Sequence, residues 1–188
     1  MTNNLFRRNP SLIILAYGSN EAGDSDFDAS QYAKRFAEML ARFQQSAPDA
    51  SILVISPPDR AEKTGKRWHS IKRLTAIVDA QRRAARAQGA AFWNLFEAMG
   101  GRGSIDRWAG LGLAQSDRVH LTRAGYGMVA GALYAQLMRG YLQSLVGQAA
   151  AKLQSGNGRW EMGDRDRIKV CTFAPHPTHH SLLITHHF

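Results

Sequence analysis

The sequence predicts one α/β domain built on a parallel sheet, and three observations support this prediction. Three short runs are continuously apolar, as is typical of strands buried on both faces of a parallel sheet. Stretches with apolar residues at helical spacing separate these runs. At 188 residues, the chain is long enough for a domain with its own core. The alternation therefore predicts parallel strands joined by right-handed helical crossovers.

The first strand and the first helix are predicted from the N-terminal part of the chain. Ser11–Tyr17 is an apolar run and is expected to be a buried strand, followed by a loop over 18–28. Either Asp28 or Ser30 can cap the next helix, which is expected to extend to about Gln45. Its apolar residues recur three or four positions apart, at Tyr32, Phe36, Met39, Leu40 and Phe43.

Two further strand–helix units complete the predicted sheet. Ser51–Ser56 is the second apolar strand, and a basic loop separates it from a helix over Lys72–Gln88. Ala91–Leu95 is the third strand, and a glycine-rich segment leads from it to a last helix that Thr122 can cap. One face of the second helix is expected to be buried, with Leu74, Ile77, Val78 and Gln81 on it.

The domain is expected to occupy residues 1–146, because the character of the sequence changes from about residue 147. Residues 147–188 hold five of the seven histidines and the single cysteine, and they show no clear periodicity. Imidazole binds zinc, copper or nickel, but the irregular spacing favours a disordered tail over a physiological metal site. Metal capture remains an alternative for the five histidines of this tail, His176, His179, His180, His186 and His187.

The formal net charge of +9 raises the question of an anionic partner. Basic residues gather between residues 60 and 73, but Trp68 is the only aromatic residue among them. Nucleic-acid binding would need more stacking residues or a known motif, so a solvated basic face without a nucleic-acid partner is expected. Attraction to an anionic polymer such as a bacterial wall is also compatible. No apolar run reaches membrane-spanning length, and the composition does not assign a compartment.

The segment Ser116–Tyr126 holds the strongest candidate for catalysis. Asp117 precedes His120 by three residues, in a turn that leads into the last helix. In a Ser-His-Asp hydrolase, the imidazole takes the proton of the nucleophile and the carboxylate holds the imidazole in the correct tautomer. On spacing alone, a helix cap and a surface histidine are the favoured interpretation.

A second candidate segment follows the first strand. Ligands of open α/β sheets bind beyond the carboxyl ends of the strands, and Asn20 lies in the loop at that edge. Its amide can donate to a developing oxyanion. Alternatively, an asparagine after a glycine bonds its own backbone. The catalytic interpretation requires Asn20 and the Asp117–His120 pair to face a common cleft.

Taken together, the two segments resemble the third and fifth sequence blocks of the SGNH/GDSL hydrolases. The resemblance covers about residues 12–142 and implies a three-layer, flavodoxin-like α/β fold and ester hydrolysis by a Ser-His-Asp triad without a cofactor or metal ion. It implies that His120 is the general base, Asp117 its orienting partner and Asn20 an oxyanion donor. The segments around Phe92–Leu95 and Ala98–Ser104 are similar to bacterial members that remove O-acetyl groups from peptidoglycan. The expected substrate is therefore an acylated small molecule or polysaccharide.

The sequence departs from the family at the nucleophile. The family places a Gly-Asp-Ser block at the end of a strand that precedes the Asn block, but only Met1 to Pro10 lie before the strand here, which is too short for a βαβ unit. We therefore expect an N-terminally truncated domain whose nucleophilic serine is not in this chain. Gly23-Asp24-Ser25 spells the tripeptide in the wrong place, so Ser25 is expected to be a decoy.

The expected truncation has a structural consequence. In the sheet order that the resemblance implies, the missing strand lies beside Leu12–Tyr17, so this apolar strand becomes an exposed edge. Exposed edges pair with other chains, and self-association or poor solubility is expected. A non-catalytic remnant or interaction module is the alternative to an esterase.

Overall fold

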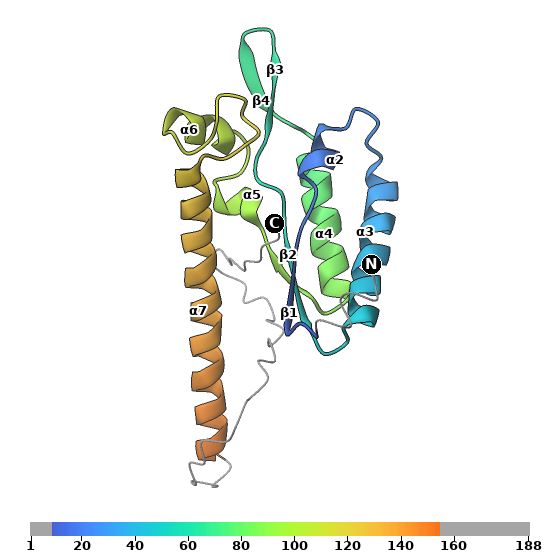
Figure 1. Ribbon diagram of the computed structural model, residues 1–188, viewed down its shortest axis with the longest axis vertical. Helices are drawn as coiled ribbons and strands as arrows, with labels where there is room; N and C mark the ends of the chain where they lie inside the picture. The colour runs from blue at the N-terminus through green and yellow to red at the C-terminus, as the bar shows by residue number, and fades with distance from the viewer. Residues whose placement is uncertain (1–8, 155–188) are drawn as a thin grey trace.

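Residues 9–154 are described by the computed structural model, and they form three layers around a parallel sheet (Figure 1). The sheet has the order β1-β2-β5, with β1 at Leu12–Ala16, β2 at Ser51–Ile55 and β5 at Ala91–Trp93. Both neighbouring pairs are parallel. The predicted fold class is confirmed, because the three apolar runs form the three strands of one parallel sheet.

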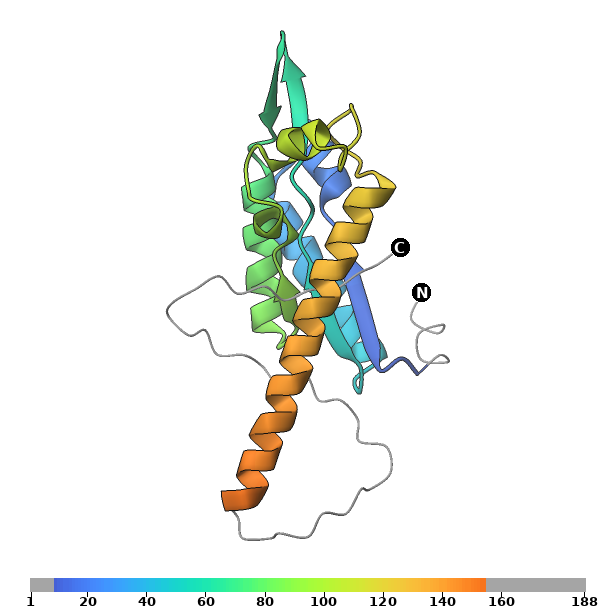
Figure 2. The same ribbon diagram turned by 90° about the vertical axis from the view of Figure 1, so that its left-hand side faces the viewer.

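Two helices cover one face of the sheet, and one long helix covers the other (Figures 1 and 2). α3 (Ala29–Ser46) and α4 (Leu74–Ala87) lie on the first face, where a core cluster joins them to β1 and β2. α7 (Arg123–Gln154) lies on the opposite face, and Val129 and Leu133 are its buried contacts with the core. The buried face of α4 includes Leu74, Ile77, Val78 and Gln81, as predicted.

Side-chain caps begin the two helices for which they were predicted. Of the two cap candidates for α3, Asp28 is the one that caps, accepting a hydrogen bond of 2.7 Å from the backbone N–H of Gln31. The Thr122 hydroxyl accepts a 3.2 Å bond from the N–H of Gly125 in the first turn of α7. Each cap satisfies one of the N–H groups that a helix start leaves unpaired.

Several short elements lie where loops were expected. α2 (Ser19–Gly23) occupies the start of the predicted 18–28 loop, and the basic loop forms an antiparallel hairpin of β3 (Ala61–Thr64) and β4 (Arg67–Ser70). α5 (Leu95–Ala98) and α6 (Ser104–Gly110) precede α7. Elements of four to seven residues are too short to show a hydrophobic period, so sequence patterns do not reveal them.

The expected boundary at residue 147 is not the end of a structural element. α7 continues through 147–154, where an irregular segment was expected. These residues extend a helix already formed, which needs no new nucleation. The rest of the predicted tail, with its five histidines, lies outside the described residues. Within residues 9–154, no helix combines the length and the apolar character needed to cross a membrane.

β1 is an edge strand of the described sheet, as expected, because it pairs only with β2. Ile13 and Leu15 are buried against α3, whereas Leu12 and Tyr17 remain 40% and 42% exposed. An edge strand presents unpaired backbone groups to any segment that approaches it. Self-association through this edge stays a prediction.

Candidate functional site

Both candidate segments lie at the end of the molecule where the strands have their carboxyl ends. α2 follows β1 there, and the turn 116–121 leads into the first turn of α7 at the same end (Figure 1). In open α/β folds this is the edge at which ligands bind.

The turn brings Asp117 and His120 into direct contact. One Asp117 carboxylate oxygen lies 2.7 Å from Nδ1 of His120. The other accepts hydrogen bonds from the backbone N–H groups of Val119 (2.9 Å) and His120 (3.1 Å). An ionised carboxylate can only accept, so Nδ1 carries the proton and Nε2 is left as an acceptor. The His120 side chain is 63% exposed, which leaves that nitrogen accessible.

The same contacts hold the pKa of the Asp117 carboxyl at about 2, below its usual value of 3.8. The hydrogen bond to the His120 side chain is the largest cause, followed by the two backbone N–H bonds. Each of these contacts favours the charged form of the carboxyl. The partner of the imidazole is therefore a carboxylate throughout the neutral and mildly acidic range.

Arg118 attaches this turn to three other parts of the molecule. Its backbone φ of 53° lies in the left-handed region, which is unusual for a residue with a side chain. Its carbonyl accepts a 3.0 Å bond from the N–H of Ala61, and its guanidinium bonds Asp106 at 3.0 Å. The guanidinium also lies 5.0 Å from the ring centre of Trp68. Such contacts can maintain a strained backbone at a functional turn.

Asn20 lies on α2, directly after the exit from β1. Gly18 makes this exit with a φ of 106°, and a Cβ there would lie 2.7 Å from a methyl carbon of the buried Ile77. The buried Gln81 of α4 donates to the carbonyl of Tyr17 and to the Tyr32 hydroxyl, both at 2.8 Å. Burial raises the pKa of the Tyr32 phenol above its usual range, against the opposing effect of the Gln81 hydrogen bond. Asn20 itself is exposed.

Two arginines hold the carbonyl groups of α2. Arg60 donates to the carbonyl of Ser19, and Arg73 donates to that of Ala22, each at 2.6 Å. Gly23 lies directly against the Arg60 guanidinium, because a Cβ at Gly23 would come within 2.6–2.8 Å of it. Cations at the carbonyl end of a helix are electrostatically favourable. These contacts fix the position of the segment that carries Asn20.

Arg60 and Ala61 connect the two candidate segments. The Arg60 side chain binds Ser19 beside Asn20, and the next backbone N–H, that of Ala61, binds the carbonyl of Arg118 between Asp117 and His120. One short segment after β2 therefore contacts both. We call residues 60 and 61 the bridging dipeptide.

The buried Asp59, just before the bridging dipeptide, anchors the surrounding loops. One of its carboxylate oxygens accepts hydrogen bonds from the Ser70 hydroxyl (3.0 Å), the Ser104 hydroxyl (3.4 Å) and the N–H of Ile105 (3.1 Å). It thereby joins the end of β4 to the start of α6. The roles of Asp59, Arg60 and Arg118 were not recognised in the sequence, whereas Gln81 was expected on the buried face of its helix but was assigned no hydrogen-bonding role.

Ser25 lies in the loop between α2 and α3, and its hydroxyl is 3.2 Å from a carboxylate oxygen of Asp26. Among residues 9–154, no serine makes a hydrogen bond with the His120 ring, whose side-chain partner is Asp117. That Ser25 is a decoy stays a prediction. In the same part of the chain, no group of three or more His, Cys, Asp or Glu side chains is arranged to hold a metal ion.

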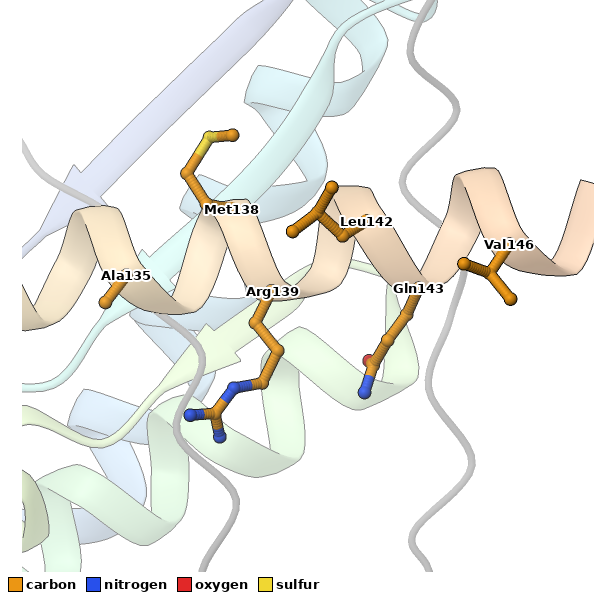
Figure 3. Close-up of a pocket in the computed structure, with 6 residues that line it drawn as sticks. All are labelled: Ala135, Met138, Arg139, Leu142, Gln143 and Val146. Atoms are coloured by element: carbon orange, nitrogen blue, oxygen red, sulfur yellow. The ribbon is translucent and has the colours of Figure 1, made fainter.

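A hollow on α7 lies apart from both candidate segments (Figure 3). The described residues that line it all come from the middle of this one helix, and they are Ala135, Met138, Arg139, Leu142, Gln143 and Val146. A second hollow beside α2 and α3 is lined partly by acidic residues, including Glu21, Asp24, Asp26 and Asp28. Neither hollow contains the acid–imidazole pair.

Comparison with known proteins identifies a family and two similar solved structures. The family model described as "GDSL-like Lipase/Acylhydrolase family" matches residues 2–128. A solved structure of a peptidoglycan O-acetylesterase is 32% identical, with a TM-score of 0.65 over 71% of this chain and 40% of that one. No curated protein matches the sequence.

A second solved structure, a lipase/acylhydrolase from Enterococcus faecalis, is similar at the level of the fold. It is 16% identical, with a TM-score of 0.50 over 68% of this chain and 60% of that one. The chain thus spans less than two thirds of the length of either protein. Because the family model matches well over half of the sequence, the chain belongs to the GDSL-like lipase/acylhydrolase family.

Proposed function

We propose that this chain supplies the general base, its orienting carboxylate and one oxyanion donor of a serine ester hydrolase that deacetylates a carbohydrate. The observation that carries the proposal is the 2.7 Å contact between Asp117 and His120 Nδ1, with the far side of the imidazole exposed. A surface histidine that merely follows a helix cap needs no carboxylate on its ring nitrogen.

The chemistry assigns one role to each side chain. A serine hydroxyl attacks the acyl carbonyl while Nε2 of His120 takes its proton, and Asp117 stabilises the imidazolium that forms. The side-chain amide of Asn20 donates to the oxyanion of the tetrahedral intermediate. The imidazolium then returns the proton to the departing alcohol, which leaves the acyl group on the serine. Water attacks this acyl-serine while His120 takes its proton, and the imidazolium gives that proton to the serine oxygen as the acid is released.

We propose that the nucleophilic serine comes from a segment outside the described residues, seated along the free edge of β1. A strand that pairs in parallel with β1 ends at the same edge of the sheet as β1 itself. Its carboxyl end would therefore lie beside α2, which carries Asn20. Leu12 on β1 and Tyr17 just after it are both partly exposed and offer apolar contacts to such a strand.

The relative with the higher identity supports an acetylated polysaccharide as the substrate. That protein is described as a peptidoglycan O-acetylesterase, and this chain resembles 40% of it. Acetyl esters of a sugar polymer are consistent with the open, exposed position of His120.

A fluorophosphonate probe, which labels an activated serine, tests the proposal when the labelled residue is identified by peptide mass spectrometry. The chain is compared alone and together with a serine-bearing segment of its family. We expect labelling on that segment in the combined protein and no labelling of Ser25. His120→Ala should abolish the labelling, whereas Ser25→Ala should leave it unchanged.

Two outcomes would contradict the proposal. Label on Ser25 would place the nucleophile within the described residues. No label under either condition, with circular dichroism showing a folded protein, would favour a non-catalytic interaction module. That second function is favoured by one observation, the lack of any serine hydrogen-bonded to His120 among residues 9–154.

A further inference from the structure

The hairpin of β3 and β4, residues 61–70, projects from one end of the described chain, opposite the end at which α7 extends beyond the sheet (Figures 1 and 2). We call it the basic hairpin. It extends beyond the carboxyl edge of the sheet, at the same end of the molecule as the Asp117–His120 turn. A two-stranded hairpin that projects from the core is only marginally stable by itself. Contacts at its base must therefore hold this hairpin in place.

The base of the hairpin is fixed to the candidate site. Ala61 donates to the carbonyl of Arg118, and Ser70 donates to the buried Asp59. The Trp68 ring is half-buried and lies 5.0 Å from the Arg118 guanidinium and 5.8 Å from the Lys63 ammonium group. A ligand on the hairpin would therefore be held next to the acid–imidazole turn.

The charges of the hairpin are exposed and almost all positive. Lys63, Lys66 and Arg67 are exposed, and Glu62 is the only acidic residue of the hairpin. Within residues 9–154, none of the three cations forms an ion pair. The exposed Lys72 and Arg102 continue the surface, where Arg102 donates to the carbonyl of Lys72 at 3.3 Å. Like charges repel one another, so such a surface gains stability when an anion binds.

We infer that the basic hairpin docks a carboxylate-bearing polysaccharide and thereby brings its acyl groups to His120. The inference rests on the proposed function and names the substrate class as an anionic polymer. A strand of four residues is about 13 Å long, so the hairpin can contact more than one charged unit of a chain. A small neutral ester would gain nothing from these cations.

The observations favour a polysaccharide over a nucleic acid. Single-stranded nucleic acids bind to basic grooves in which several aromatic side chains stack with successive bases. The hairpin has one aromatic side chain, Trp68, and two cations already contact its ring. Carboxylates spaced along a sugar polymer need only the exposed cations.

The first test measures binding to polygalacturonate by fluorescence anisotropy of a labelled oligomer. The double variant K66E/R67E reverses two charges of the hairpin. Its matched control, R83E/R86E, reverses two exposed charges on the C-terminal half of α4, towards the opposite end of the sheet. We expect K66E/R67E to weaken binding about tenfold and the control to change it by about twofold or less.

The salt dependence and a conservative variant sharpen this test. Binding should weaken strongly at about 0.5 M salt, because exposed charges are screened there. K66R/R67K keeps both charges and should bind like the unchanged protein. Equal losses in both reversed-charge variants would show that only net charge matters and would overturn the inference. Tighter binding to poly(U) than to polygalacturonate at the same salt would favour a nucleic acid and would also overturn it.

A second test separates this inference from the proposed function. In the chain combined with its serine-bearing segment, K66E/R67E should raise KM for acetylated polygalacturonate about tenfold. The rate of p-nitrophenyl acetate hydrolysis should stay unchanged. His120→Ala should abolish hydrolysis of both esters and leave polygalacturonate binding intact. Loss of polygalacturonate binding in K66E/R67E but not in R83E/R86E supports the hairpin as the docking surface, even if hydrolysis is never observed. Unchanged KM and binding in this variant would refute the docking surface alone.

Discussion

The segment with Asn20 and the turn with Asp117 and His120 lie at one edge of the sheet, but different kinds of contact hold them. The acid–imidazole pair is held from within the turn, since Asp117 bonds groups two and three residues away. α2 and the exit from β1 before it are held from outside, by Arg60, Arg73 and Gln81, which lie 41 to 64 residues away from their partners along the chain. The acid–imidazole pair is therefore a local structure, whereas the position of Asn20 is a property of the whole fold.

The difference predicts how each segment responds to mutation. A change in the turn should affect the chemistry and leave the fold intact, because the side chains of Asp117 and His120 are exposed. A change in the contacts of α2 should affect stability and catalysis together, because the same side chains connect separate elements. The bridging dipeptide, Arg60 and Ala61, is where the two kinds of contact meet.

The largest effect is expected from Asp117→Asn. An asparagine can keep the backbone bonds of the turn through its oxygen, but its NH₂ group would face Nδ1 and stabilise the wrong tautomer of His120. We expect kcat/KM for ester hydrolysis to fall by about a hundred- to ten-thousandfold. The midpoint of thermal unfolding should change little, which calorimetry would check.

The control for this variant is Asp106→Asn, an exposed carboxylate that contacts Arg118 instead of the imidazole. Its effect on kcat/KM should be much smaller. If the two variants lose equal activity, Asp117 acts only by keeping the turn in shape.

Arg60→Ala is expected to have a smaller effect on catalysis but a clear effect on stability. The substitution removes the charged donor to the Ser19 carbonyl and leaves that group beside a partly buried space. We expect a loss of about 1–2 kcal/mol in the free energy of unfolding, measured by urea denaturation, and about a tenfold loss of kcat. Arg83→Ala on the exposed face of α4 is the matched control and should change neither quantity.

How much of this site could be predicted from the sequence depends on the range of its contacts. The spacing of Asp117 and His120, with Thr122 as a cap, predicted a compact turn because its hydrogen bonds are local. The apolar runs likewise predicted the three strands of the sheet. These features depend on neighbours along the chain, which a sequence displays directly.

The remaining features depend on partners that no local pattern identifies. In the sequence, Arg60 is only one of several basic residues in a predicted loop. In the structure, its side chain contacts Ser19 and lies against Gly23. The basic hairpin was missed because its strands have four residues each and are mostly polar, so they lack the apolar alternation of a half-buried strand. The length of α7 beyond residue 147 depends on helix propagation, which composition does not limit sharply.

Gly23→Ala tests the Arg60 contact with a smaller change. In a helix, alanine is normally more stable than glycine by about 0.5–1 kcal/mol. Here the new Cβ would displace the Arg60 guanidinium, so we expect a small net loss of stability instead. In the Arg60→Ala background the same substitution should become neutral or stabilising, and a double-mutant cycle of urea denaturation would measure this reversal. Stabilisation in both backgrounds would contradict the proposed packing.

The smallest expected effect is a local one, the titration of Asp117. Its folded pKa of about 2 lies below the ordinary value of 3.8, so its contribution to the stability of the turn is complete above that ordinary value and is lost as the pH falls through about 2. The carboxyl carbon-13 resonance of Asp117, followed by NMR, should therefore titrate near pH 2. Because the His120 side chain is the largest cause of the shift, His120→Ala should move the midpoint towards 3.8. A midpoint that stays near 2 in this variant would instead assign the shift to the N–H groups of Val119 and residue 120, and the turn would hold a carboxylate with or without an imidazole.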